Sequence, residues 1–451
     1  MAGSASPVSP VPPPVPSSRP MPEHFDALIL GAGPAGLAAA EILARAGRTV
    51  GLVDEQAQPG GQFGRERIRQ RPGRSGRKLL EWLQHRNGIT YFPGHRVVDC
   101  DPHPALVTES TRGSTRLTGG ALILAPGARE LVLPFPGWTL PGVFCAGGLQ
   151  ALAKSGWPVR GRRIVLAGSG PLLVASAHTL RHEGAEILAI IEQAARGSVA
   201  RFLAGLPTWP AKALQTLGYL PTWARIPYET GAFVAEALGE ERLEAVRIVE
   251  RGRTRIVPCD LLGTGFGLIP NVEAAARLGC VLTPTPHPSV RVDGLQATSL
   301  PGIYAAGEVT GIGGVERAQI EGAIAGYAAV GNLHKARALA PKLAHWARFG
   351  EAVNRHFALR DPLRALARPD TVICRCEDVT LGEIDSAGGQ GSVKLLTRLG
   401  MGPCQGRICL AALAELCPGY GTVTGSQAAR PPLFPARLGT LAGEPAPEPH
   451  P

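Results

Sequence analysis

The chain has 451 residues, which is more than one hydrophobic core usually holds, so two or three domains are expected. Hydrophobic residues make up 44% of the chain and charged residues 18%, which excludes a collagen-like or wholly disordered protein. The formal net charge is +10, but the basic residues are scattered, so a nucleic-acid partner is not expected. Nine cysteines are too few for a disulfide-stapled protein, yet four of them fall between positions 374 and 409.

Both ends of the chain have the composition of disordered tails. Residues 1–24 are rich in proline, serine and alanine and lack the basic and apolar segments of a signal peptide. Residues 421–451 return to proline, glycine and alanine, and a second tail is predicted there. No run of about 18 apolar residues occurs, so no transmembrane segment is predicted. The expected location is the cytoplasm, with peripheral attachment to the inner membrane left open.

A complete nucleotide-binding pattern begins near residue 25. The sequence predicts an apolar strand, a glycine-rich turn, an alanine-rich helix and a second strand over residues 25–30, 31–36, 37–46 and 49–53. Gly31 allows the tight turn, Gly33 lets backbone N–H groups approach a pyrophosphate, and Gly36 permits close packing of helix on strand. Asp54 lies about twenty residues beyond the first glycine, at the spacing of an acid that accepts ribose hydroxyls, and Glu55 follows it.

This pattern resembles the FAD half of flavoproteins with two dinucleotide-binding domains, the group that includes glutathione and thioredoxin reductases. The segment Pro59-Gly60-Gly61-Gln62 agrees with that resemblance, as does the segment 121–128, although its usual Thr is Pro126. Residues 300–308 resemble the second FAD motif, with Glu308 in place of the usual Asp. A helix expected over 315–330 would point its N-terminus at the flavin ring. The resemblance implies that FAD is held by Gly31, Gly33, Pro34, Ala35, Gly36, Asp54, Glu55, Gly61, Gln62, Gly127, Gly307 and Glu308.

The same pattern returns after residue 161, with a strand, the turn 168–173, a helix and a strand that ends at Glu192. In the resembling flavoproteins this inserted unit binds a nicotinamide cofactor, which implies Gly168, Gly170 and Glu192 as contacts and favours NAD over NADP. Leu173 replaces the third glycine, so the helix must shift or a neighbour must be small. Whether NAD(P) binds is therefore left open, and Arg196 is a candidate partner for a 2′-phosphate.

Disulfide reductases of this fold carry two cysteines spaced CxxC near the flavin. Cys145 lies in a similar place, but Gly148 stands where its partner would be. Dithiol exchange by this route is not expected, and Cys145 is interpreted as a small packing residue. No acid–base pair for substrate chemistry is found near the flavin motifs, so the catalytic residues stay unassigned. His287 and His356 are interpreted as surface residues.

Four cysteines near the C-terminal end form a CxC pair, Cys374 and Cys376, and a Cx4C pair, Cys404 and Cys409. Alternate side chains of an extended segment share one side, so the first pair can reach one centre. Glycines before Cys404 leave backbone N–H groups free for cluster sulfurs. Four thiolates suit either Zn²⁺ or a [2Fe–2S] cluster. The surrounding residues resemble the bacterioferritin-associated-ferredoxin type of [2Fe–2S] domain, and that resemblance favours the iron–sulfur cluster.

Together the two parts resemble, over residues 25–420, the A or α subunits of bacterial hetero-oligomeric amine and opine dehydrogenases. That group includes the A subunits of octopine and nopaline oxidase, the α subunits of dye-linked proline and hydroxyproline dehydrogenases and the B subunit of hydrogen cyanide synthase. The resemblance implies an α/β fold, a two-dinucleotide-binding-domain flavoprotein with a small α-rich [2Fe–2S] domain. Its parts are an FAD domain over residues 25–140 and 286–332, an inserted NAD(P)-binding-like domain over 141–285, a helical linker over 333–369 and the cluster domain over 370–420.

The function implied is that of an electron-transfer subunit containing FAD and a [2Fe–2S] cluster. A catalytic flavoprotein β subunit would oxidise the C–N bond of an amino acid or opine, and this chain would relay the electrons. A small ferredoxin-like γ subunit is a further expected partner. Three alternatives stay open: a self-sufficient NAD(P)H-dependent flavin reductase, a hydrogen cyanide synthase subunit that takes part in glycine oxidation, and a zinc-stapled docking scaffold.

Overall fold

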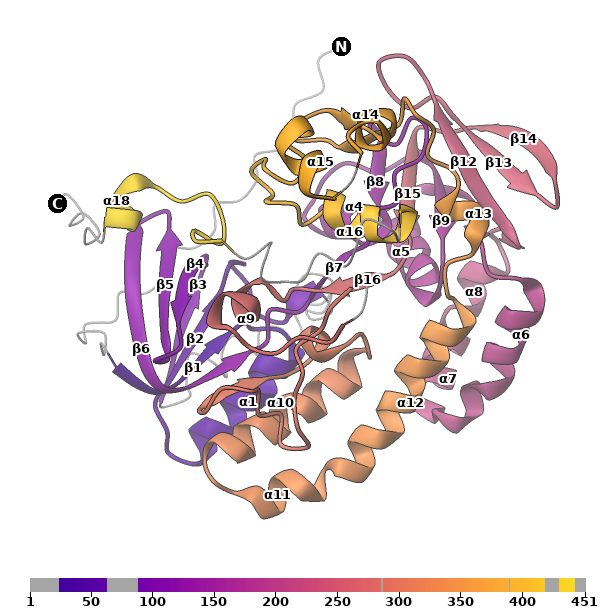
Figure 1. Cartoon of the computed structure of the whole chain (residues 1–451). Coiled ribbons are helices and arrows are strands. Elements are labelled where there is room, and N and C mark those ends of the chain that lie inside the picture. Colours follow the sequence, from indigo (N-terminus) through magenta and orange to yellow (C-terminus); the bar gives the residue numbers. More distant parts are fainter. Residues whose placement is uncertain (1–23, 63–87, 285–286, 389, 418–429, 443–451) are drawn as a thin grey trace, which may run out of the picture.

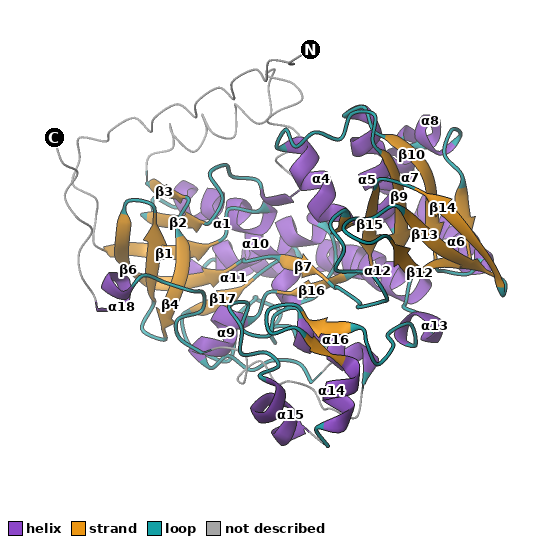
Figure 2. Cartoon of the chain, turned by 90° about the horizontal axis from the view of Figure 1, so that it is seen from above, coloured by secondary structure: helices purple, strands orange, loops and turns teal. Residues whose placement is uncertain are grey.

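A computed structural model describes residues 24–62, 88–284, 287–388, 390–417 and 430–442 (Figure 1). The described chain is built on two large sheets that lie on opposite sides of the view in Figure 2. We call the part around the first sheet the first unit and the part around the other the second unit. The prediction of an α/β fold is confirmed.

The first unit contains a seven-stranded sheet with the order β3-β2-β1-β6-β5-β4, in which β17 also pairs with β6. The pairs of β1 with β2 and β6, of β2 with β3 and of β6 with β17 are parallel. Their strands are largely buried and apolar, as expected where helices cover a parallel sheet. The bounds are β1 His24–Leu30, β2 Val50–Asp54, β3 Ile89–Pro93, β4 Arg96–Asp101, β5 Ala105–Ser110, β6 Gly113–Leu124 and β17 Ile303–Ala305.

Helices α1 (Pro34–Arg45) and α10 (Val315–Ala329) pack closely together against this sheet. The close approach depends on glycine, because a Cβ atom at Gly322 would lie 2.0 Å from the Ala35 carbonyl oxygen. The start of α1 thereby lies beside the middle of α10.

The second unit has a five-stranded parallel sheet with the order β11-β10-β9-β15-β8, and an antiparallel β12-β13-β14 sheet beside it. The strands are β8 Val143–Cys145, β9 Arg163–Gly168, β10 Glu186–Glu192, β11 Tyr228–Thr230, β12 Ala232–Leu238, β13 Ala245–Glu250, β14 Arg253–Pro258 and β15 Leu261–Gly265. The helices are α4 Ala146–Lys154, α5 Pro171–His182, α6 Arg196–Gly205, α7 Pro210–Gly218 and α8 Leu220–Trp223, with a 3₁₀ turn at Leu206–Thr208.

Two short antiparallel strands join the units, β7 (Ala128–Glu130) and β16 (Leu268–Pro270). Helix α9 (Glu273–Leu278) follows β16, and a 3₁₀ turn at Glu308–Thr310 follows β17. Helices α11 (Leu333–Ala338) and α12 (Ala340–His356) then run from the first unit back to the second (Figure 1).

The four predicted cluster cysteines lie in a small module that follows α13 (Asp361–Arg364). Its elements are β18 Val372–Cys374, β19 Val379–Thr380, α14 Leu381–Ser386, α15 Gln390–Thr397 and α16 Cys409–Leu416. Thr380 and Glu383 form a capping box that starts α14. The module has its own apolar core, in which Ile384 is fully buried.

The prediction of a disordered tail over residues 421–451 is wrong for residues 430–442, the part of it that the structure describes. Leu433 is 2% exposed, belongs to the core of the first unit, and donates its amide to the Val98 carbonyl at 2.6 Å. This contact covers part of edge strand β4, and α18 (Leu438–Ala442) follows. Of the other predicted tail, only His24 is described, as the first residue of β1. No helix in the described ranges is long and apolar enough to cross a membrane.

Candidate functional site

The first glycine turn is shaped by two close steric constraints. A Cβ atom at Gly31, which has a φ of 103°, would lie 2.2 Å from the Ala125 carbonyl oxygen, and one at Gly36 would lie 1.8 Å from the Gly31 oxygen. Gly33 differs, because none of the described atoms beyond its chain neighbours comes within 4 Å of its Cβ position. The turn is therefore packed behind Gly31 and Gly36 and open in front of Gly33.

Helix α1 begins at this open side. Pro34 is in its first turn, Gly33 is its N-cap, and no side chain caps the helix. The first amide groups of a helix have no partners within it and carry the positive end of its dipole. The open space in front of Gly33 thus meets N–H donors that suit a phosphate.

Neighbouring segments hold the turn in place. Gly60 donates its amide to the Ala32 carbonyl at 2.7 Å, and the Cβ position of Gly61 lies 3.2 Å from the Gly33 Cα. Gln62 is the last described residue of this segment and is exposed.

The two acids after β2 have different environments. Asp54 accepts the Ala32 amide at 2.6 Å and the Gln56 amide at 2.7 Å, so its carboxylate is fixed against the turn. Glu55 is exposed and pairs with Arg96 at 2.7 Å. Each oxygen of a carboxylate can accept more than one hydrogen bond, so Asp54 keeps capacity for ribose hydroxyls.

The second FAD motif packs on the first. Gly307 lies directly after β17, and its Cβ position is 3.0 Å from the Ala35 side chain. Glu308 accepts the amides of Gly313 and Gly314, at 3.0 and 2.8 Å, at the start of α10. Burial raises the pKa of Glu308. The carboxylate predicted to reach the ribityl chain therefore lies against the helix end that was predicted to face the flavin ring. Gly127, between β6 and β7, has a φ of 75° and open space at its Cβ position.

One buried acid beside this motif was missed in the sequence. Glu321 is 1% exposed and accepts hydrogen bonds from the Gly307 amide (2.8 Å), the Thr310 hydroxyl (2.8 Å) and Arg317 Nε (2.7 Å). Burial raises the pKa of Glu321. Arg317 and Glu321 stand four residues apart in the helix, and that spacing was the available signal.

In the second unit, Leu173 is fully buried, and the neighbour that makes room for it is Gly265. A Cβ atom at Gly265 would lie 3.2 Å from Leu173 Cδ2, and one at Gly168 would lie 2.0 Å from the Gly265 oxygen. The expected compensation by a small residue is confirmed. Glu192 is also fully buried and accepts the Gly170 and Ala194 amides at 2.7 and 2.8 Å. Burial raises the pKa of Glu192.

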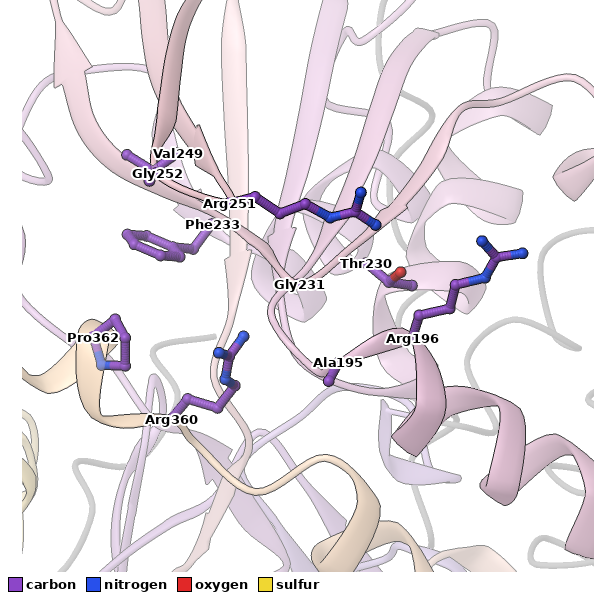
Figure 3. Close-up of a pocket in the computed structure, with 10 residues that line it drawn as sticks. All are labelled: Ala195, Arg196, Thr230, Gly231, Phe233, Val249, Arg251, Gly252, Arg360 and Pro362. Atoms are coloured by element: carbon purple, nitrogen blue, oxygen red, sulfur yellow. The ribbon is translucent and has the colours of Figure 1, made fainter.

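Arg196 begins α6 at the rim of a cavity of about 450 Å³ beside this turn (Figure 3). Arg251 and Arg360 also line that cavity. The cavity is lined from β11, β12, β13 and the chain after α12, so it lies beyond the carboxyl end of β10.

The two histidines interpreted as surface residues are partly buried and bonded, which corrects that interpretation. His287 Nε2 lies 2.9 Å from Glu415 Oε1, with 20% of its side chain exposed. The His356 carbonyl accepts the Ser198 hydroxyl at 2.9 Å. Both link segments that are far apart in the sequence, which is why the local pattern did not reveal them.

Side-chain contacts connect the four predicted cluster cysteines. The Cys409 thiol, which has one proton to donate, lies within hydrogen-bond reach of both Cys374 and Cys404, and Cys404 contacts Cys376. The Cys409 donation, together with backbone amides such as those of Gly400 and Gly406, lowers the pKa of Cys374 to about 6 and that of Cys404 to about 5. The same donation raises the pKa of Cys409. The module thus favours thiolates at Cys374 and Cys404, which are the form that binds metals.

Backbone amides also approach the sulfurs of two of the four cysteines. Cys374 accepts the Gly400 and Glu377 amides, and Cys404 accepts the Gly406 and Ile408 amides. A Cβ atom at Gly402 would lie 2.4 Å from the Cys376 Cβ, so only glycine lets that loop approach. Within the described ranges, no three of the His, Cys, Asp and Glu side chains have the arrangement of a metal-bound group. Amide donors to sulfur are a feature that tunes iron–sulfur centres.

Arg407, between Cys404 and Cys409, connects this module to the first unit, and no local sequence pattern indicated that role. Its side chain is 9% exposed, its guanidinium lies 4.2 Å from the Phe434 ring centroid, and it donates to the Leu433 carbonyl. Arg96 lies 5.3 Å from the same ring centroid. We call Arg407, Phe434 and Arg96 the arginine clamp. Since Arg96 pairs with Glu55, the clamp leads from the cysteine loop to the acid pair after β2.

A second link reaches the strands between the units. Glu273 of α9 lies 2.8 Å from Arg129 and 3.5 Å from Arg407, and Arg129 Nε donates to the Arg407 carbonyl at 3.3 Å. The cysteine loop is therefore fixed to both the first unit and β7.

The comparison with protein families agrees with this geometry. Residues 25–329 match the family model described as pyridine nucleotide-disulphide oxidoreductase. The chain belongs to this family. It is an FAD-dependent oxidoreductase with two units of the dinucleotide-binding fold, so the fold class and the enzyme class predicted from the sequence are confirmed.

Curated relatives of this oxidoreductase include two subunits of larger enzymes. It is 32% identical to the A subunit of opine oxidase from Rhizobium meliloti, over 93% of this chain and 88% of that one. It is 35% identical to the HcnB subunit of hydrogen cyanide synthase from Pseudomonas aeruginosa, over 86% of this chain and 91% of that one.

Solved structures share the fold of this oxidoreductase. L-proline dehydrogenase from P. horikoshii aligns with a TM-score of 0.66 at 21% identity, over 93% of this chain and 79% of that one. Thioredoxin reductase from T. acidophilum aligns with a TM-score of 0.53 at 22% identity, over 69% of this chain and 99% of that one.

The family name includes disulphide chemistry, but the Cys145 position of this oxidoreductase is unsuited to it. Burial and the nearby Glu130 raise the pKa of Cys145 to about 12, so the thiol stays protonated. Glu130 itself accepts the Gly147 and Gly148 amides, each at 2.9 Å. The interpretation of Cys145 as a packing residue agrees with these surroundings.

Proposed function

We propose that this oxidoreductase is the electron-transfer A or α subunit of a hetero-oligomeric dehydrogenase that oxidises the C–N bond of an amino acid or opine. FAD would be held by the first glycine turn with Asp54 and by the second motif with Glu308. A [2Fe–2S] cluster would be held by Cys374, Cys376, Cys404 and Cys409. These ligand assignments stay predictions.

The observation that carries the proposal is the connection between the two sites. The arginine clamp joins the loop between Cys404 and Cys409 to the first unit, and Glu273 joins it to the strands between the units. A loop fixed at several points holds its cysteines at a constant distance from the glycine turn. When bound, the flavin would exchange two electrons and the cluster one at a time.

The chain's own residues have distinct parts in this scheme. The free amides at the start of α1 would bind the pyrophosphate, while Asp54 orients the turn. Amides of the 400–408 segment would hold negative charge on the sulfurs. Cys376 is exposed, so that side of the module is open to a redox partner.

The relatives support the assignment to a subunit. The opine oxidase and hydrogen cyanide synthase relatives are both named as parts of larger enzymes, and each matches most of this chain. Beside the second FAD motif, Glu308 and Glu321 have their carboxylates bonded to backbone amides or Arg317. This arrangement is consistent with a catalytic site on a separate β subunit. A ferredoxin-like γ subunit is the further partner that we propose.

The cluster is tested by electron paramagnetic resonance and metal analysis of the anaerobically reconstituted chain. Cys404→Ser is expected to lose the reduced-cluster signal and most of the iron while keeping FAD, because the flavin motifs lie in the first unit, outside the cysteine module. Cys417→Ser is the matched control, since Cys417 lies outside the four cysteines, and it should keep both groups. Zinc without iron in the parent protein would refute the relay and favour a docking scaffold.

A role in glycine oxidation is a second candidate, because the hydrogen cyanide synthase relative is 35% identical over 91% of its length. The test is dye reduction by the complex that co-purifies with this chain, with glycine, proline and opines as separate substrates. Turnover of glycine with cyanide release would favour this candidate. Turnover of an opine or proline alone would exclude it.

A further inference from the structure

The two glycine turns of this chain share one motif but have different surroundings. At Gly33 no atom of the described residues lies within 4 Å of the Cβ position, whereas at the equivalent Gly170 the Cβ position lies 3.7 Å from the Cβ and Cγ atoms of Phe357. Both turns have a glycine at the N-cap of the following helix and an acid that accepts a turn amide. The difference is therefore due to what lies over the second turn.

The second turn is covered by residues 356–360, which begin at the last residue of α12 and which we call the covering segment. The Ser169 hydroxyl, within the turn, donates to the Phe357 carbonyl at 2.7 Å. Gln193 Nε2, next to Glu192, donates to the Ala358 carbonyl at 2.9 Å, and the Arg360 amide donates to Gln193 Oε1 at 3.2 Å. These bonds hold the covering segment against the turn and against the residue that follows Glu192.

The covering segment is anchored on both sides. Within it, the Phe357 ring lies 5.0 Å from the Phe202 ring of α6, and before it Phe349 of α12 lies 5.3 Å from Trp209, centroid to centroid. After it, Leu363 is 1% exposed in the core of the second unit. Displacing the covering segment from the turn would therefore break the packing at both ends of the segment as well as its hydrogen bonds.

We propose that the covering segment occupies the place at which the second glycine turn would receive a dinucleotide pyrophosphate, so that NAD(P)H does not reduce the flavin through this unit. The residues present do not fit the nicotinamide cofactor that the fold family implies. The second unit then serves as a frame that carries the helical linker and the cysteine module. This inference is independent of the cluster and of any partner subunit, and it argues against a self-sufficient NAD(P)H-dependent reductase.

The first test mixes the full-length, FAD-loaded chain anaerobically with NADH or NADPH and follows the flavin absorbance. No bleaching is expected with either nucleotide, while dithionite in a parallel sample should bleach the flavin and show that it is reducible. Saturable bleaching by NADH or NADPH would overturn the proposal. The FAD content is measured beforehand, so a failure of FAD binding is recognised separately.

The second test measures amide hydrogen exchange of residues 356–360. Ser169→Ala removes the hydroxyl that donates to Phe357, so exchange there is expected to rise about fivefold. Ser176→Ala is the matched control, because the Ser176 hydroxyl is buried in the same unit and has no hydrogen-bond partner among the described residues, and it should change nothing. Unchanged exchange in Ser169→Ala, or faster exchange of the parent in millimolar NADH, would contradict the proposal.

Discussion

At the scale of single residues, Gly33 is the position where added volume should remove a ligand without disturbing the fold. Its Cβ position is free of described atoms, so Gly33→Val is expected to fold but to lose most bound FAD by blocking the pyrophosphate. The ratio of flavin to protein absorbance after gel filtration measures this. Gly197→Val, which also adds volume in open space but on α6, should keep FAD. A yellow Gly33→Val protein would exclude this turn as the FAD site.

Leu433 is the residue that shows the C-terminal segment to be structural. It is 2% exposed in the core of the first unit, so Leu433→Ala should lower the free energy of unfolding by about 2–5 kcal/mol. Leu438→Ala removes the same side-chain volume at a position that is 84% exposed, and it should have almost no effect. Urea denaturation followed by fluorescence compares the two, and equal stabilities would show that the segment is not part of the core.

Arg407 is expected to govern the position of the cysteine loop more than cofactor loading. Arg407→Ala removes the contact with Phe434, a loss of about 1–2 kcal/mol in unfolding free energy, while Glu273 keeps its Arg129 partner. Iron and FAD contents should be retained, but electron transfer from flavin to cluster should slow in stopped-flow measurements. Arg398→Ala, at a side chain that is 66% exposed, is the control and should transfer electrons at the parent rate.

At the scale of elements, the carboxylate of Glu415 connects helix α16 to residues outside it. Glu415 bonds His287 and Arg364, each at 2.9 Å, and these contacts lower the pKa of Glu415. Because the pKa of Glu415 is lower in the folded state, its ionised carboxylate stabilises the fold at pH values above the unfolded-state pKa of about 4.3. That stabilisation is lost as the pH falls through the folded-state pKa.

The resulting prediction concerns stability in mild acid. The parent chain should lose unfolding free energy more steeply than Glu415→Gln as the pH falls below about 4.3. Urea denaturation at a series of pH values measures the difference, with Asp385→Asn as a control outside the docking contact. Parallel curves for the parent and Glu415→Gln would show that this carboxylate does not contribute.

The elements that sequence could predict are those set by local patterns. Both glycine turns, their flanking strands and the acids Asp54 and Glu192 follow from spacing within about thirty residues. The covering segment could not be predicted, because Ser169 and Phe357 stand 188 residues apart and Phe357, unlike Ser169 of the second glycine turn, belongs to no motif. Arg407 and Leu433 were missed for the same reason: their partners are distant in the sequence, and short patterns carry no information about such contacts.

At the scale of the whole molecule, the two ends of the sequence are expected to differ in how much they contribute to structure and activity. Deletion of residues 1–22, which lie outside the described ranges, is expected to leave the absorbance spectrum and the activity unchanged. Loss of either after this deletion would show that the N-terminal residues contribute to the structure.

The short β7–β16 pair would by itself let the second unit swivel relative to the first. The covering segment ties the far side of that unit to α12, which packs on α10 of the first unit, so any swivel must break the bonds of Ser169 and Gln193. The two units are therefore connected at two places, through β7–β16 and through α12 with the covering segment, and this should prevent a hinge motion between them. Its small-angle scattering profile should therefore be the same in the oxidised and the reduced protein.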